Sequence, residues 1–158
     1  MQISENILSR EDAKELDVFR GKGQQYFYNN FPTIIREYVE KVGESSKYPI
    51  NYQSRKSYWE VQHRPQGHIV HYDTGSSQHM LWCGYSSSTL LSFPQEFEGG
   101  LVHFWDEDNN KIRTITPEEH YLSALHYRSN QNEKIGKHSV DSHKGMRVVL
   151  LIFMECFE

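Results

Sequence analysis

The spacing of apolar residues divides the chain into a helical beginning and a strand-rich remainder. Ser9 is placed to cap a helix over residues 10–16, whose acidic first turn suits the positive end of the helix dipole. A second helix is expected over residues 32–42, because apolar residues recur there on one helical face and Gly43 follows. We therefore expect residues 1–44 to form a helical support that packs on the β core.

From Tyr58 onward, short runs of β-branched and aromatic residues alternate with turn residues. About eight strands are expected, over residues 58–63, 68–72, 80–93 (one or two strands), 101–106, 111–116, 121–127, 137–140 and 146–157. Strands without interleaved helices indicate a double-sheet barrel or sandwich rather than a parallel α/β sheet. The fold class is therefore mainly β, with a β core over residues 58–157.

Length and charge narrow the class of protein further. The chain has 158 residues, which suits a single domain over 1–158. Its net charge of −4 does not favour a nucleic-acid partner.

We expect no membrane association, because no apolar run reaches the roughly 20 residues of a membrane span. With no visible secretory signal, we expect a cytoplasmic location, where Cys83 and Cys156 would be buried, reduced thiols.

The segment His71-Tyr72-Asp73 is the first candidate for chemistry. Side chains alternate along a strand, so His71 and Asp73 point the same way and can share one metal ion. His68 is expected to face away, which argues against a zinc site built from His68 and His71. An imidazole and a carboxylate, joined by a second histidine from a distant strand, form the ligand set typical of non-haem Fe(II).

Further motifs follow this segment in a recognisable order. The series is Gly67, His71-Tyr72-Asp73, Phe97-Glu98-Gly99-Gly100, Pro117, His138-Ser139-Val140 and Gly145-Met146-Arg147. In this order the chain resembles the prolyl 4-hydroxylase-like branch of the Fe(II)/2-oxoglutarate-dependent dioxygenases, roughly from Trp59 to Phe153. The combined pattern is far more specific than any of its parts.

The resemblance implies a double-stranded β-helix, or jelly-roll, with the N-terminal helices packed on one face. It implies His71, Asp73 and His138 as catalytic metal ligands for Fe(II), and Arg147 as the residue that binds the cosubstrate 2-oxoglutarate. The implied reaction uses O2 and couples decarboxylation of 2-oxoglutarate to hydroxylation of a substrate, with ascorbate as a supporting reductant.

Arg147 can also be assessed from its own surroundings. It opens the most apolar strand of the chain, and a buried guanidinium there needs an anion. A dicarboxylate supplies one, because guanidinium binds carboxylate through two parallel hydrogen bonds. The alternative is that Arg147 lies at the exposed end of the strand.

The sequence leaves the substrate open. The resemblance favours a prolyl or other peptidyl residue, and a free amino acid or small metabolite is the alternative. A cupin-type or non-catalytic metal-binding β-sandwich is the alternative from another class, and the oligomeric state is not predicted.

Some residues depart from the family pattern or have no assigned role. Arg64 and Ser92 stand where the family often has tyrosines, so the second 2-oxoglutarate contact is unassigned. His143 is expected either to face the cosubstrate pocket or to lie on the surface. Residues 72–79 and 130–136 are expected to form mobile loops. The remaining histidines are expected to be structural or exposed: His63, His79, His103, His120 and His126.

Overall fold

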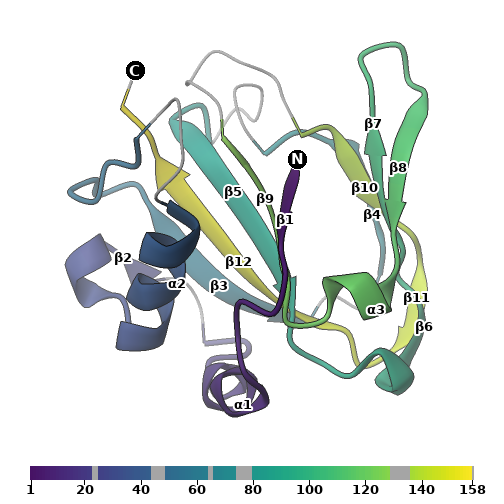
Figure 1. The fold of residues 1–158 in the computed structure, drawn as a ribbon, viewed down its shortest axis with the longest axis horizontal. Coiled ribbons are helices and arrows are strands. Elements are labelled where there is room, and N and C mark those ends of the chain that lie inside the picture. Colours follow the sequence, from purple (N-terminus) through teal and green to yellow (C-terminus); the bar gives the residue numbers. More distant parts are fainter. Residues whose placement is uncertain (23–24, 44–48, 64–65, 74–79, 129–135, 158) are drawn as a thin grey trace.

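Two β-sheets face each other, and two helices cover the outer face of the larger sheet (Figure 1). The computed structural model describes residues 1–22, 25–43, 49–63, 66–73, 80–128 and 136–157. The larger sheet has the order β1 (Gln2–Ser4), β9 (Ala124–Arg128), β5 (Cys83–Leu90), β12 (Val148–Glu155), β3 (Tyr58–His63) and β2 (Gln25–Tyr26). The smaller sheet has the order β4 (His68–His71), β10 (His138–Val140), β7 (Val102–Trp105) and β8 (Lys111–Ile115).

All paired strands run antiparallel, and the fold has the expected double-sheet form. Strands β9, β5, β12 and β3 form the centre of the larger sheet and face the four strands of the smaller one. A short ribbon of β6 (Phe97–Gly99) and β11 (His143–Gly145) extends the structure beyond the smaller sheet (Figure 1). The prediction of a mainly β jelly-roll with about eight core strands is confirmed.

The apolar run of β12 is continuous because both faces of this central strand are covered. Val148, Leu150 and Ile152 belong to the cluster beneath the helices, whereas Val149 and Phe153 belong to clusters on the side of the smaller sheet. The alternation along β12 therefore separates a structural core on one face from the interior of the jelly-roll on the other.

The helices form where the sequence predicts them. In α1 (Arg10–Asp17), the Ser9 hydroxyl accepts from the Asp12 amide at 3.1 Å, and the Asp12 carboxylate accepts from the Ser9 amide at 3.0 Å. In α2 (Thr33–Gly43), Ile35 and Val39 are fully buried in the cluster that also contains Trp59. The N-terminal helices are thus bound to the sheet by side-chain packing.

Several boundaries differ from the sequence-based expectations. Residues 1–44 include β1 and β2 as well as helices, and of the one or two strands expected over residues 80–93 the structure has one, β5. Between the strands expected over 111–116 and 121–127 lies a short helix, α3 (Pro117–His120), with a capping box between Thr116 and Glu119. The short strands β1, β2, β6 and β11 exist through pairing with distant segments, which local patterns do not reveal.

Both cysteines are free and buried, as expected. Within the described residues, no helix combines the length and apolar character needed to cross a membrane.

The burial of β12 generates a prediction of stability. Ile152 is 0% exposed between the helices and the sheet, whereas Ile112 on β8 is 65% exposed. Ile152→Ala is expected to lower the free energy of unfolding by about 2–5 kcal/mol, and Ile112→Ala by less than about 0.5 kcal/mol. Urea denaturation monitored by circular dichroism measures both. Equal effects of the two substitutions would contradict this assignment of the core.

Candidate metal centre

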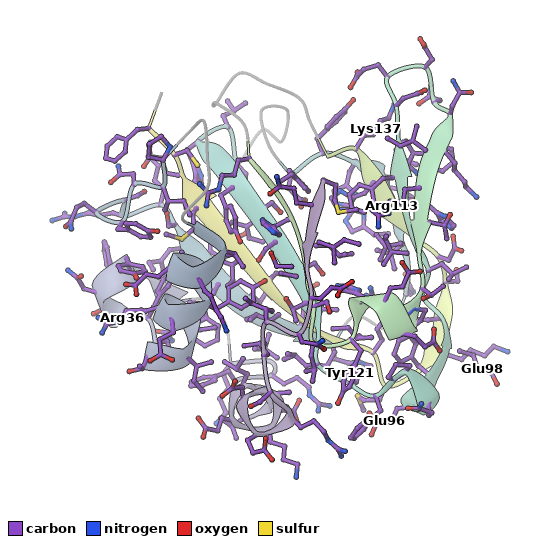
Figure 2. The ribbon with its side chains drawn as sticks, viewed as in Figure 1. Arg36, Glu96, Glu98, Arg113, Tyr121 and Lys137 are labelled. Atoms are coloured by element: carbon purple, nitrogen blue, oxygen red, sulfur yellow. The ribbon has the colours of Figure 1, made fainter. Side chains whose placement is uncertain are left out.

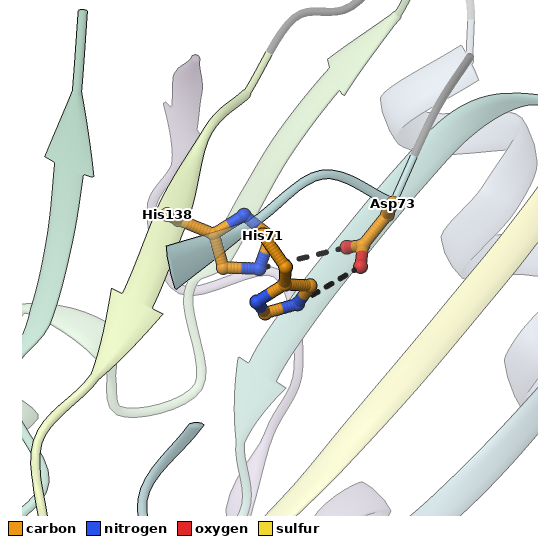
Figure 3. Close-up of side chains that lie close together, drawn as sticks. All are labelled: His71, Asp73 and His138. Atoms are coloured by element: carbon orange, nitrogen blue, oxygen red, sulfur yellow. Dashed lines mark ion pairs between the residues drawn. The ribbon is translucent and has the colours of Figure 1, made fainter. Parts of the chain in front are cut away.

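Three side chains that are distant in sequence converge between the two sheets: His71, Asp73 and His138 (Figure 3). His71 ends β4, His138 begins β10, and these two residues are paired across the strands. Asp73 follows β4 and turns back toward both rings. One ligand atom from each residue lies within 4.8 Å of the others, which is a spacing that one metal ion can span.

Backbone carbonyls orient both imidazoles. Nδ1 of His71 donates to the carbonyl of Ile69 at 2.7 Å, and Nδ1 of His138 donates to the carbonyl of Gly136 at 2.5 Å. With Nδ1 protonated, the lone pair of each ring is on Nε2. The two Nε2 atoms lie 3.2 Å and 3.6 Å from the Asp73 carboxylate oxygens. This tautomer, held from behind by a carbonyl, is the one that metal-binding histidines use.

Asp73 is held by two hydroxyl groups that the sequence analysis did not identify. Its Oδ2 accepts from Ser86 at 2.7 Å and from Tyr127 at 2.8 Å. Nothing in the local sequence marks these residues, because they lie on β5 and β9 and meet Asp73 only in the folded chain. Both donors stabilise the ionised carboxylate.

Electrostatics prepares the site for a cation. Burial alone would raise the pKa of Asp73, but its contacts with His71 and His138 and the hydrogen bond from Ser86 hold it well below its ordinary value. Burial lowers the pKa of His138, so its imidazole is neutral at pH 7. An ionised carboxylate and neutral imidazoles are the protonation states that metal ligands require.

Gly136 links two of the three ligands. Its φ of +74° lies in the left-handed region, and a Cβ there would collide with the ring of Tyr127. The same residue provides the carbonyl that orients His138. The positions of His138 and of Tyr127, which holds Asp73, are therefore coupled through one glycine.

The expectation that His68 faces away from His71 is wrong. Their ring centroids lie 3.7 Å apart, and both residues line the same cavity. The cause is a bulge, because His71 pairs with His138 while His68 pairs with Val140, so that β4 uses one residue more than β10 over the same distance. His68 stacks on His71 but is not one of the three clustered ligand groups.

The triad opens into a cavity of about 290 Å³ between the sheets. The larger sheet forms one wall of this cavity. Its strand register arranges the side chains on that wall in rows that cross β9, β5, β12 and β3. The first row consists of Tyr127, Ser86, Phe153 and Tyr58, and the second of Leu125, Ser88, Leu151 and Glu60. The first row contains both hydroxyl groups that hold Asp73.

Arg147 lies at the other end of this cavity. It immediately precedes β12, is 6% exposed and lines the cavity together with the triad. This burial contradicts the alternative that Arg147 lies at an exposed strand end. Gly100 leaves room for it, since a Cβ on Gly100 would lie 3.0 Å from Cδ and 3.1 Å from Nε of Arg147. Gly100 thus helps to shape the cavity around Arg147.

The remaining described histidines mostly make structural contacts. His103 bridges Thr114 and Asp141, His126 bonds to Ser4, and His63 bonds to the Arg147 carbonyl. Burial, assisted by the charge of Arg147, lowers the pKa of His120 to about 3, so this ring is neutral beside Ser88. His143 is neither in the cavity nor on the surface, because it is buried against Phe97.

Ser92 does not line the cavity. Its hydroxyl accepts from the amide of Val148 at 2.9 Å, so it supports the start of β12. Arg64 and His79 lie outside the described residues, as do most of the two segments expected to be mobile loops, 72–79 and 130–136. The second cosubstrate contact is therefore not assigned to either departure from the family pattern.

Comparison with known proteins identifies similar folds but no similar sequence. No protein-family model and no curated protein matches the chain. A viral collagen prolyl hydroxylase from Paramecium bursaria Chlorella virus-1, solved with 2-oxoglutarate, aligns over 99% of this chain and 96% of its own, with a TM-score of 0.65 and 14% identity.

Two bacterial structures are also similar. An oxidoreductase of the 2OG-Fe(II) oxygenase family from Burkholderia pseudomallei aligns over 94% of this chain and 80% of its own, with a TM-score of 0.57 and 14% identity. A prolyl-4-hydroxylase from Pseudomonas putida aligns over 98% of this chain and 91% of its own, with a TM-score of 0.58 and 11% identity. The shared feature at these identities is the fold.

The geometry predicts which histidines bind metal. His71→Ala removes a ligand and is expected to lower the affinity for Mn²⁺ or Co²⁺ at least about a hundredfold, since the loss of a supporting contact alone costs about 10–100-fold. His68→Ala removes a stacked neighbour and should change that affinity less than about tenfold. Isothermal titration calorimetry distinguishes the two variants. Stronger dependence on His68 than on His71 would show that the ligand set is different.

Proposed function

We propose that this protein is an Fe(II)- and 2-oxoglutarate-dependent oxygenase. The observation that carries the proposal is a single cavity with the His71, Asp73 and His138 donors at one end and buried Arg147 at the other. The similar folds of the 2OG-Fe(II) oxygenases agree with this reading.

The donor set suits Fe(II). Two imidazole nitrogens and one carboxylate oxygen on a common side leave three coordination positions open for a cosubstrate and oxygen. The anionic Asp73 offsets part of the metal charge, and the carbonyls of Ile69 and Gly136 keep both imidazoles in the ligating tautomer. These contacts would hold the ligands ready before the ion arrives.

Arg147 suits the distal carboxylate of 2-oxoglutarate. A buried guanidinium requires an anion, and a dicarboxylate with its 2-oxo acid end at the metal directs its other carboxylate away from it. Leu125 and Leu151 line the cavity between the two ends and would limit the access of water to the bound cosubstrate. The protein thus provides a charged group at each end, with the apolar side chains of Leu125 and Leu151 between them.

When bound, iron with 2-oxoglutarate and O2 supplies an oxidation in which 2-oxoglutarate becomes succinate and CO2 while one oxygen atom enters a C–H bond of the substrate. The protein's own part is to hold the ligands, orient the cosubstrate and position the substrate carbon. Ascorbate would support the enzyme by keeping the iron reduced.

For the substrate we propose a peptidyl residue, with proline as the first choice. The support is the likeness to two structures named as prolyl hydroxylases. A free amino acid or small metabolite is the alternative within the same chemistry.

Turnover of 2-oxoglutarate tests the oxygenase proposal. Purified protein with Fe(II) and ascorbate should convert 2-oxoglutarate to succinate, and anaerobic addition of 2-oxoglutarate to the Fe(II) protein should produce a weak visible absorption band. Asp73→Ala, in which the anionic ligand is lost, should abolish both signals. If the unmodified protein gives neither signal, the oxygenase proposal fails.

Arg147 provides a separate prediction for the cosubstrate. Arg147→Ala should raise the concentration of 2-oxoglutarate needed for half-maximal turnover about 10–100-fold, because a charge-assisted hydrogen bond contributes roughly 1.5–3 kcal/mol. Arg113→Ala is the matched control, since Arg113 is an exposed arginine on β8 that is not among the residues lining the cavity (Figure 2). Steady-state kinetics with varied 2-oxoglutarate measures both variants. An unchanged requirement in Arg147→Ala would assign the cosubstrate to another residue.

A further inference from the structure

Glu60 is a carboxylate in the cavity that the metal centre and the cosubstrate site do not use. It is half-buried on β3 and lines the cavity in the second row, beside Leu151. Within the described part of the chain, no basic side chain forms an ion pair with Glu60. Its side-chain hydrogen bond comes from Nε2 of Gln62 to Oε1, at a long 3.4 Å.

The strand register places Glu60 close to the metal centre. It lies two residues along β3 from Tyr58, and Tyr58 belongs to the row that holds Asp73. Two residues along a strand advance roughly 7 Å. Burial raises the pKa of Tyr58, and the charges of Glu60 and Asp73 raise it further, so both carboxylates are near enough to act on this hydroxyl. Glu60 therefore lies one row from the hydroxyl groups that hold Asp73, in the lining of the same cavity.

Charge balance gives Glu60 a role. A divalent metal and a dianionic cosubstrate compensate each other, and the charge of Asp73 compensates that of Arg147. Among the described residues that line the cavity, the charge of Glu60 is then left without a cationic counterpart, and burial without one is costly for a carboxylate. A cationic group on the remaining component, the substrate, would balance it.

We propose that Glu60 selects substrates with an ammonium or guanidinium group near the carbon that is oxidised. This inference rests on the proposed function and narrows its substrate class to basic peptide segments or basic amino acids. The carboxylate would bind the cation through charge-assisted hydrogen bonds and hold the neighbouring C–H bonds toward the metal.

Paramagnetic relaxation provides a test that does not depend on turnover. The protein is loaded with saturating Mn²⁺ and 2-oxoglutarate, and proton relaxation is recorded by NMR for n-butylammonium and for 1-butanol, its neutral isostere. Enhanced relaxation of butylammonium relative to butanol is the expected result. Glu60→Gln should weaken butylammonium binding about tenfold or more, because it removes a charge-assisted contact.

Two variants act as controls. Glu98→Gln makes the same chemical change on β6, where the side chain points away from the protein, and should bind butylammonium like the unmodified protein (Figure 2). Glu60→Asp keeps the charge and should keep the preference for the cation. Thermal unfolding of each variant monitors its fold.

The possible failures can be distinguished. Equal relaxation of the two probes in the unmodified protein, or a preference for the cation that survives in Glu60→Gln, would overturn the role of Glu60. Mn²⁺ and 2-oxoglutarate binding are measured on the same samples by water-proton relaxation and calorimetry. If either one fails to bind, the proposed function fails, and the role of Glu60 fails with it.

Discussion

The site depends on keeping one buried carboxylate ionised. Asp73 is removed from bulk water, and burial alone would favour its neutral form. Two imidazoles and two hydroxyl groups from β4, β10, β5 and β9 reverse that preference. The facing sheets must therefore meet in one particular register, because a slip of one residue would turn Ser86 or Tyr127 away from Asp73.

Much of this arrangement could be predicted from local patterns. The capped helix after Ser9, the strand over residues 58–63 and the run that forms β12 all have strong periodic signals, and the structure places them within a residue or two of expectation. The family resemblance, carried by the order of the motifs, identified His71, Asp73, His138 and Arg147, four residues that line one cavity. The order of the motifs predicted these residues because each motif lies on a particular strand of the fold.

Other features could not be read from the sequence, because they depend on pairing between distant segments. The bulge in β4 exists only in relation to β10, so regular alternation gave the wrong orientation for His68. Ser86, Tyr127 and Glu60 belong to unremarkable strand sequences, and their shared cavity follows from the register of neighbouring strands. Local patterns suffice for the long elements, whereas the short paired strands and the surroundings of the ligands require the tertiary fold.

The pairing of β4 with β10 has a consequence for folding. It brings together His71 and His138, which are far apart in the chain, so the complete ligand set exists only after the smaller sheet has formed. An ion that binds this set binds the native state in preference to the unfolded chain and stabilises it by mass action. The supply of metal would then regulate the amount of folded protein as well as its chemistry. The ion would link β4 to β10 at the edge of the smaller sheet.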